Sequence, residues 1–267
     1  MSRGTSAGLA ALLALACMAA VAGAATAAVA GPAARAEVGS LALGAALAFT
    51  GASTTCPPEA VGANECYRVD GSGLVPGLGR VSESFVISYV NNATDCPSTS
   101  SYRSFGFPVR LTVAGKGAID LAVAASTACM TVDEVFRLSR PFTVTSGTGP
   151  YATATGNGML SRLLLGGAGT DTWSGTLVVP GLEFNLTAPT IRGAASKTVR
   201  APRGAKQARV AFAVTAEDDR DGRVPVSCTP KSGTRFKIGR TRVNCLATDG
   251  DGNAQRANFT VRVVKTR

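Results

Sequence analysis

The chain has 267 residues, of which 31 are glycine, 6% are aromatic and none is histidine, and its formal net charge is +10. A chain of this length buries enough apolar surface to fold unaided. The lack of histidine excludes Ser-His-Asp and Cys-His catalysis, and with no Cys-x-x-Cys spacing the usual zinc frameworks are also missing. Because abundant glycine with few aromatic residues favours short strands and tight turns, we predict an all-β protein.

The N-terminus predicts an export signal. Arg3 precedes an almost uninterrupted apolar run over residues 7–30, and Ala34-Arg35-Ala36 has the small-x-small pattern of a cleavage site. We therefore assign residues 1–36 to a signal peptide and expect a secreted or cell-surface protein. A retained membrane anchor is the alternative, since the run is long enough to cross a bilayer, but its high alanine content makes it only weakly apolar.

The cysteines indicate disulfide bonds. Cys17 belongs to the predicted signal, and the remaining count of six is even, as expected for an exported protein. Sequence order favours three neighbouring pairs, although fifteen pairings are possible. The favoured pairs are Cys56 with Cys66, Cys96 with Cys129, and Cys228 with Cys245.

Residues 37–186 form the first predicted domain. Short apolar segments separated by glycine turns recur along it, and alternation is visible at Phe85, Ile87 and Tyr89. The segment 114–117, Ala-Gly-Lys-Gly, is typical of a hairpin. Regular spacing of about eight such strands predicts an antiparallel β-barrel.

One segment of this domain resembles a known barrel family. Residues 142–158, FTVTSGTGPYATATGNG, are similar to the Gly-Thr-Gly-x-aromatic hairpin of dirigent and allene oxide cyclase-like barrels, with Tyr151 as the aromatic residue. The resemblance implies an eight-stranded barrel whose interior can accept an apolar small molecule. A barrel filled by its own side chains is the alternative that we favour. Trp173, the single tryptophan, is expected in the core, with a sugar-stacking role as the alternative.

The sequence offers no convincing catalytic motif. Paired carboxylates could act as acid and base, with Glu83 and Asp171 as examples, but no spacing singles out a pair. We therefore predict a protein that is not an enzyme.

Residues 187–267 form the second predicted domain, with a different charge. Residues 37–186 contain eight Lys/Arg and eleven Asp/Glu, whereas residues 187–267 contain seventeen and six, a net of +11. Such asymmetry argues for two domains. Apolar residues alternate at 210, 212 and 214, at 224, 226 and 228, at 243 and 245, and at 259, 261 and 263. Because Cys228 and Cys245 share the apolar phase, we expect their bond to join the two layers of a small sandwich.

This region resembles the hyalin repeat (HYR) domain, roughly over residues 188–264. The matching residues, in order, are Ala216-Glu217-Asp218, Cys228-Thr229-Pro230, Ser232-Gly233, Phe236, Ile238-Gly239, Val243, Cys245, Ala247-Thr248-Asp249 and Gly252-Asn253. The resemblance implies an immunoglobulin-like β-sandwich of extracellular, often adhesive, proteins, with no enzymatic activity. The basic residues at 231, 235, 237, 240 and 242 depart from the family's usual small or polar residues.

The basic run provides the candidate binding residues. Lys231, Arg235, Lys237, Arg240 and Arg242 are predicted to attach the protein to an anionic polysaccharide or cell-envelope polymer. A merely solvated strand face is the alternative. Nucleic acid is disfavoured, because stacking readers interleave aromatic side chains with basic ones and this domain has three phenylalanines in apolar positions.

The six acids of this domain lie in two connections, at 217–221 and 249–251. In an immunoglobulin-like sandwich these loops emerge at the same end. Asp219, Asp249 and Asp251 are weak candidates for a Ca²⁺ site. Ordinary turn chemistry is the alternative that we favour, so no cofactor is predicted.

Together these patterns predict an exported, two-domain, non-catalytic binding or adhesion protein without a membrane span after processing. The alternative is a small-molecule carrier or cyclase-like enzyme in the barrel, with the HYR-like domain as an accessory module. A deep cavity with an inward carboxylate or tyrosine favours the alternative, and a closed core favours adhesion.

Overall fold

The computed structural model describes residues 38–91, 101–129, 135–165 and 167–266. The predicted export signal and Cys96 lie outside these residues. Within them the chain is all-β, as predicted, apart from a single 3₁₀ turn, η1 (Gly149–Tyr151). No helix in this described part is long and apolar enough to cross a membrane.

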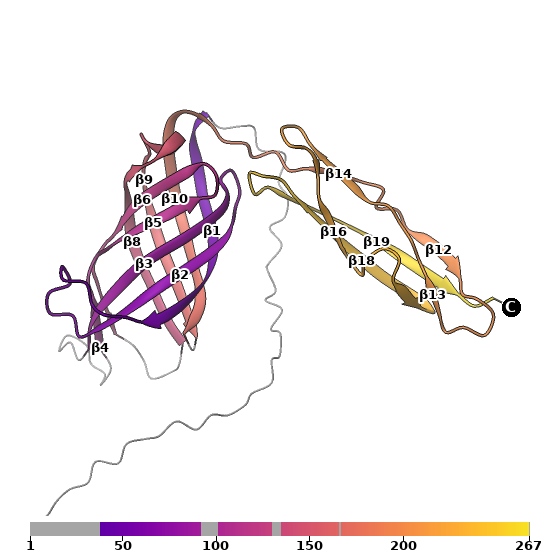
Figure 1. Cartoon of the computed structure of the whole chain (residues 1–267), viewed down its shortest axis with the longest axis horizontal. Helices are drawn as coiled ribbons and strands as arrows, with labels where there is room; N and C mark the ends of the chain where they lie inside the picture. The colour runs from indigo at the N-terminus through magenta and orange to yellow at the C-terminus, as the bar shows by residue number, and fades with distance from the viewer. Residues whose placement is uncertain (1–37, 92–100, 130–134, 166, 267) are drawn as a thin grey trace, which may run out of the picture. The chain divides into compact units, whose positions relative to one another are not determined.

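The N-terminal region is an antiparallel β-barrel (Figure 1). Its strands are β1 (Val38–Ser53), β2 (Glu65–Val75), β3 (Gly79–Asn91), β5 (Phe107–Val113), β6 (Gly117–Val123), β8 (Val135–Gly147), β9 (Thr155–Leu165) and β10 (Ala168–Glu183). They follow the order β2-β1-β10-β9-β8-β6-β5-β3, and pairing of β2 with β3 closes the ring. Two short strands, β4 (Ser101–Ser104) and β7 (Ser126–Cys129), extend the sheet beyond β3. The eight closed strands, counted over the described residues, confirm the predicted barrel.

Alternation of side chains builds the barrel core. In β1, residues 41, 43, 45, 47 and 49 are buried while the residues between them are exposed. The same period of two appears in β5, whose odd-numbered residues are buried, because successive strand side chains point to opposite faces. Since closure brings all inner faces together, these residues form one apolar cluster.

The two turns predicted from the sequence, at 114–117 and within 142–158, each connect neighbouring antiparallel strands. Residues 114–116 connect β5 to β6, with the Lys116 amide donating to the Val113 carbonyl, as the predicted hairpin requires. The connection from β8 to β9 contains η1 and buries Tyr151 against the core. Gly149 has a φ of 62°, which favours glycine at this turn.

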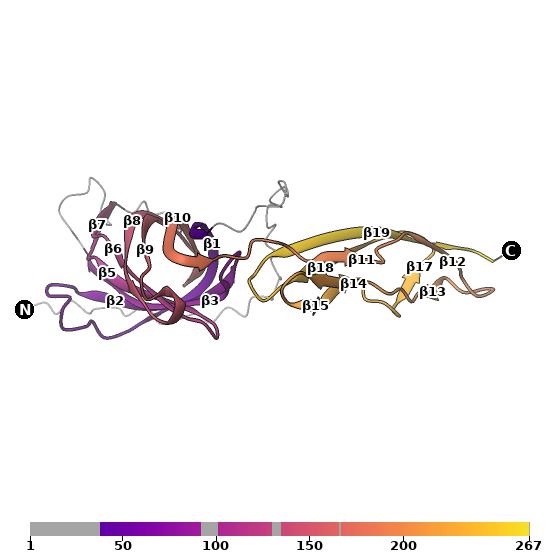
Figure 2. The same cartoon turned by 90° about the horizontal axis from the view of Figure 1, so that it is seen from above.

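The C-terminal region consists of small sheets around a second core. One sheet has the order β12-β19-β18-β16, formed by β12 (Lys197–Arg200), β19 (Ala254–Val264), β18 (Gly239–Thr248) and β16 (Val226–Thr229). The others comprise β11 (Thr190–Arg192), β14 (Thr215–Asp218) and β15 (Gly222–Val224), and the pair β13 (Gln207–Arg209) with β17 (Arg235–Lys237). Figure 2 shows β19 on one side of this region and β13 and β15 on the other. Phe236 of β17 and Val243 and Phe259 of the four-stranded sheet share one buried cluster, so the sheets form two layers.

Two strands differ from the sequence expectation. Residues 210–214 are not a strand, because Ser232 Oγ receives the Phe212 amide proton and donates to the Phe212 carbonyl in place of a ladder partner. The expected strand through Val224, Val226 and Cys228 is divided at Pro225 into β15 and β16. Proline has no amide hydrogen to donate, so a ladder breaks there.

Two predicted disulfides are present: Cys56 with Cys66, and Cys228 with Cys245. The second, however, was placed wrongly between the two layers. Cys228 lies directly opposite Cys245 on the neighbouring strands β16 and β18, so the bond joins strands of one sheet. Shared apolar phase is compatible with either arrangement, and only the strand order separates them.

Candidate functional site

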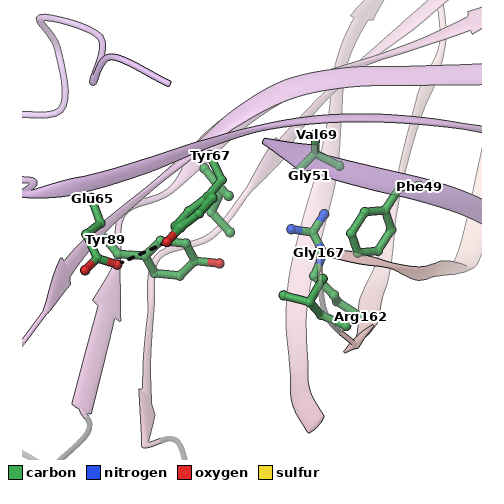
Figure 3. Close-up of a pocket in the computed structure, with 10 residues that line it drawn as sticks. Phe49, Gly51, Glu65, Tyr67, Val69, Tyr89, Arg162 and Gly167 are labelled. Carbon is green, nitrogen blue, oxygen red and sulfur yellow. Dashed lines mark hydrogen bonds between the residues drawn. The ribbon is translucent and has the colours of Figure 1, made fainter. Parts of the chain in front are cut away.

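The barrel contains a cavity of about 280 Å³ near one end (Figure 3). Its wall comes from strands β1, β2, β3 and β9 and from the turn between β9 and β10. The lining residues are Phe49, Gly51, Glu65, Tyr67, Val69, Ile87, Tyr89, Arg162, Leu164 and Gly167. Tyr67 keeps 37% of its surface exposed, whereas Arg162 is buried, so the wall runs from a wet rim to a dry interior. This volume lies just below the usual range for small-molecule sites. The favoured expectation of a completely filled barrel is therefore wrong at this end.

Arg162 is the fixed charge of the cavity. Its Nε and Nη2 donate to the two carboxylate oxygens of Asp171, at 2.8 and 2.5 Å, and both side chains are almost fully buried. The guanidinium also lies 4.6 Å from the ring centroid of Phe49 and 5.1 Å from that of Phe85. A bidentate pair with stacked aromatic rings holds a guanidinium in one orientation. Figure 3 shows Arg162 beside Phe49, with Tyr67 and Tyr89 together across the cavity.

A second carboxyl group lies deeper in the same interior. Glu83 accepts a 2.7 Å hydrogen bond from the indole nitrogen of Trp173, while its Oε1 has no partner. Burial, with the neighbouring charge of Asp171, raises the pKa of Glu83 to about 8. The structure thus brings together Glu83 and Asp171, the two carboxylates that the sequence could not single out. Glu83 is not among the residues that line the cavity.

Arg140 is an unusual buried cation. Its side chain is fully buried, forms no ion pair with any described residue, and donates from Nη1 to the Phe105 carbonyl at 3.4 Å. Its Nε and Nη2 have no hydrogen-bond partner, although buried charges are normally paired. Burial lowers the pKa of Arg140 to about 10, so the group is still charged at neutral pH. The guanidinium lies 5.4 Å from the centroid of the Phe107 ring.

The second candidate site is the exposed face of the β12-β19-β18-β16 sheet, which we call the arginine face. Its arginines are Arg200, Arg240, Arg242, Arg256 and Arg262. All five are exposed, and none forms an ion pair with a described residue. The four strands, all within the described chain, contain no Asp or Glu. Four of the arginines are neighbours. Arg240 of β18 lies opposite Arg262 of β19, and Arg242 lies two residues after Arg240 on the same strand. Arg200 lies on β12, the strand that pairs with β19 on its other side. Directly opposed side chains are about 5 Å apart at Cβ.

The five basic residues proposed from the sequence are divided between places. Arg240 and Arg242 belong to the arginine face, with the solvent exposure expected for their phase. Arg235 and Lys237 flank the buried Phe236 on β17, in the other layer, and point away from the core. Lys231 is exposed in the connection between β16 and β17.

Four of the six acids of the C-terminal region, Asp219, Asp221, Asp249 and Asp251, lie in adjacent turns, whereas Glu217 and Asp218 belong to strand β14. Asp221 Oδ2 accepts a 2.5 Å hydrogen bond from the Gly250 amide, which links the β14–β15 turn to the β18–β19 turn. Asp249 is buried and accepts from the Asn253 amide at 2.7 Å and from its side-chain nitrogen at 2.8 Å. Asp219 is exposed and Asp251 is half-buried. Within the described residues no three Asp, Glu, Cys or His side chains are grouped to hold a metal ion, and the Asp249 bonds are ordinary turn chemistry.

Sequence reasoning missed several of these residues. Arg140 and Arg162 occupy inward positions of their strands, where apolar residues are normal. Each lies two positions from a buried apolar residue, Phe142 or Leu160, and this spacing could have shown from the sequence that both arginines point inward. Arg200 and Arg262 lie far from Arg240 in sequence, and only the pairing of β12, β19 and β18 brings them together.

Comparison with known proteins identifies one part of the chain. Residues 185–263 match the family model of the HYR domain, which is typical of extracellular, adhesion-type proteins. No family is identified for the barrel, so its likeness to dirigent and allene oxide cyclase-like proteins remains a prediction. Neither the comparison with curated proteins nor that with solved structures found a match. With the two disulfides, the HYR domain indicates an extracellular protein.

Proposed function

We propose that this is an exported, non-catalytic binding protein that attaches through the arginine face to an anionic polysaccharide or cell-envelope polymer. The observation that carries the proposal is the group of neighbouring, unpaired arginines on an acid-free sheet surface. The acids of this region lie elsewhere, on strand β14 of another sheet and in the β14–β15 and β18–β19 turns. A separated positive surface attracts a polyanion and orients its approach.

The composition of the face favours a polysaccharide over a nucleic acid. Between the arginines lie threonine and asparagine, including Thr198, Thr260 and Asn258, which offer hydrogen bonds to sugar hydroxyl groups. Of the three phenylalanines of the region, Phe236 and Phe259 are buried, and Phe212 is partly buried against the same core. Binding of single strands depends on exposed aromatic rings on which bases stack, and the face provides none.

The test is a binding titration of the full chain on polygalacturonate, a regular carboxylated polysaccharide, at several salt concentrations. Affinity should fall as salt rises, since exposed charges are screened. Arg240→Gln with Arg262→Gln should weaken binding about tenfold or more. Arg235→Gln with Lys237→Gln removes the same charge from the other layer and should weaken it much less.

Two outcomes would contradict the proposal. Equal losses in the two double variants would mean that net charge alone, and not this face, draws the polymer. Tighter binding to single-stranded DNA than to polygalacturonate, at matched charge and salt, would mean that the arginine face binds nucleic acid and not a polysaccharide.

A second function is favoured by the cavity: binding of a small molecule inside the barrel. Apolar walls at Phe49, Val69 and Ile87 combine with the fixed guanidinium of Arg162 and the hydroxyl of Tyr89, a combination typical of ligand sites. Of the two alternatives for the barrel, carrier and cyclase-like enzyme, the geometry supports the carrier. Glu83, the carboxyl group with a pKa suited to proton transfer, lies outside the cavity wall. The small-molecule function is tested with the octan-1-ol titration described below.

A further inference from the structure

The barrel interior near the cavity carries more positive than negative charge. The charge of Arg162 is matched by Asp171 at hydrogen-bonding distance. The charge of Arg140 is matched by no described residue, and its interaction with Arg162 is repulsive. Glu83 does not supply the missing charge, because burial keeps it protonated at neutral pH. A buried, uncompensated guanidinium destabilises a protein, so its presence calls for a role.

The two arginines form one rigid arrangement around aromatic rings. Arg162 lies over Phe85, Phe85 stacks on Phe107 with centroids 4.9 Å apart, and Arg140 lies over Phe107. Tyr89, which lines the cavity, interacts electrostatically with both arginines. The excess charge is therefore fixed in place before any ligand arrives, so binding costs little further ordering of these side chains.

The acid on the cavity wall does not cancel this charge. Glu65 lies at the start of β2, where it accepts a 3.5 Å hydrogen bond from the Tyr67 hydroxyl. Tyr67 and Glu65 are both partly exposed. Water and salt screen charges at such a rim far more than charges in the interior. An ion that enters past the rim meets Arg162 and Tyr89 on the wall and the field of Arg140 behind them.

We propose that the barrel cavity binds an organic monoanion, a small amphipathic molecule whose carboxylate lies at Arg162 and Tyr89 and whose apolar part contacts Phe49, Val69, Ile87 and Leu164. The proposal rests on the small-molecule function of the barrel and adds the chemical class of the ligand. Arg140 acts through its charge, as a positioning residue behind the site. An aliphatic carboxylate supplies both the head group and the apolar contact area that this wall offers.

Calorimetric titration of the full chain with octanoate and octan-1-ol tests the proposal, because the two probes differ only in the head group. We expect saturable binding of both, with octanoate at least tenfold tighter. Arg140→Gln should weaken octanoate binding severalfold and leave octan-1-ol binding unchanged, because it removes a buried positive charge that attracts the carboxylate and not the hydroxyl group. Arg140→Lys keeps the charge and should retain most of the affinity.

Arg110→Gln is the matched control, because Arg110 is an exposed barrel arginine that pairs with Asp120 on the outer surface. It should leave both titrations unchanged, and an equal loss of octanoate binding there would overturn the proposal. Equal affinity of the unsubstituted protein for octanoate and octan-1-ol would overturn the proposal and leave the small-molecule function intact, even if Arg140→Gln does not fold. Absence of saturable binding for both probes would remove the function and the proposal together.

Discussion

The buried carboxyl group of Glu83 makes the stability of the barrel depend on pH in an unusual direction. In the folded barrel its pKa is raised to about 8 by burial and by Asp171, whereas the unfolded chain has the ordinary value of 4.5. Between these values the unfolded state is ionised and the folded state is protonated, so the folded state binds one more proton. The free energy of unfolding therefore falls as pH rises through this window. The contribution of Glu83 to that free energy is fully present only below about pH 4.5.

The expected size follows from the slope. One proton of difference changes the free energy of unfolding by about 1.4 kcal/mol per pH unit, so the barrel should lose about 3 kcal/mol between pH 5 and pH 7.5. No histidine titrates in this window, because the chain has none, and Asp249, whose pKa is raised by burial, belongs to the C-terminal region and not to the barrel. Asp70 and Asp120 have lowered pKa values, owing first to hydrogen bonds from Ser84 and Arg110, and therefore titrate below it.

Glu83→Gln should abolish this slope, because the amide does not ionise and its oxygen can still accept from Trp173. Urea unfolding at several pH values, followed by the fluorescence of the single tryptophan, reports on the barrel alone. Glu59→Gln, at an exposed loop position, should keep the slope of the unsubstituted protein. Parallel pH profiles for Glu83→Gln and the unsubstituted protein would refute the reasoning.

Two further predictions concern the same interior. Asp171→Asn removes the counter-ion of Arg162 and should lower barrel stability by about 3–5 kcal/mol in urea unfolding; a loss below about 1 kcal/mol would show that the pair is not needed. Gly71→Ala places a methyl carbon 2.5 Å from Glu83 Oε1, so we expect a loss of about 1–3 kcal/mol, while Gly44→Ala, with nothing within 4 Å, should be neutral in the same assay. Equal midpoints for the two alanine variants would argue against a tightly packed Glu83.

The all-β class, the barrel and the HYR resemblance could be predicted because they depend on local patterns. Period-two alternation, glycine turns and the ordered matches from 216 to 253 are all visible along the chain. The same local logic placed Arg240 and Arg242 on a solvent-facing phase and paired four of the six cysteines correctly. A prediction that depended on which strands are neighbours in the sheet could fail. The Cys228–Cys245 bond was expected between two layers and instead joins neighbouring strands of one sheet.

The sequence by itself determined which side chains point inward, since alternation fixes the phase of each strand. Only the tertiary structure decided what they meet there. Glu83 and Asp171 are 88 positions apart in sequence, and ring closure through β2 and β3 together with the pairing of β9 and β10 places them with Arg162 in one interior. The arginine face likewise arises from the order β12-β19-β18. Strand order is set by the burial of whole faces, a property of the assembled sheet that no short segment carries.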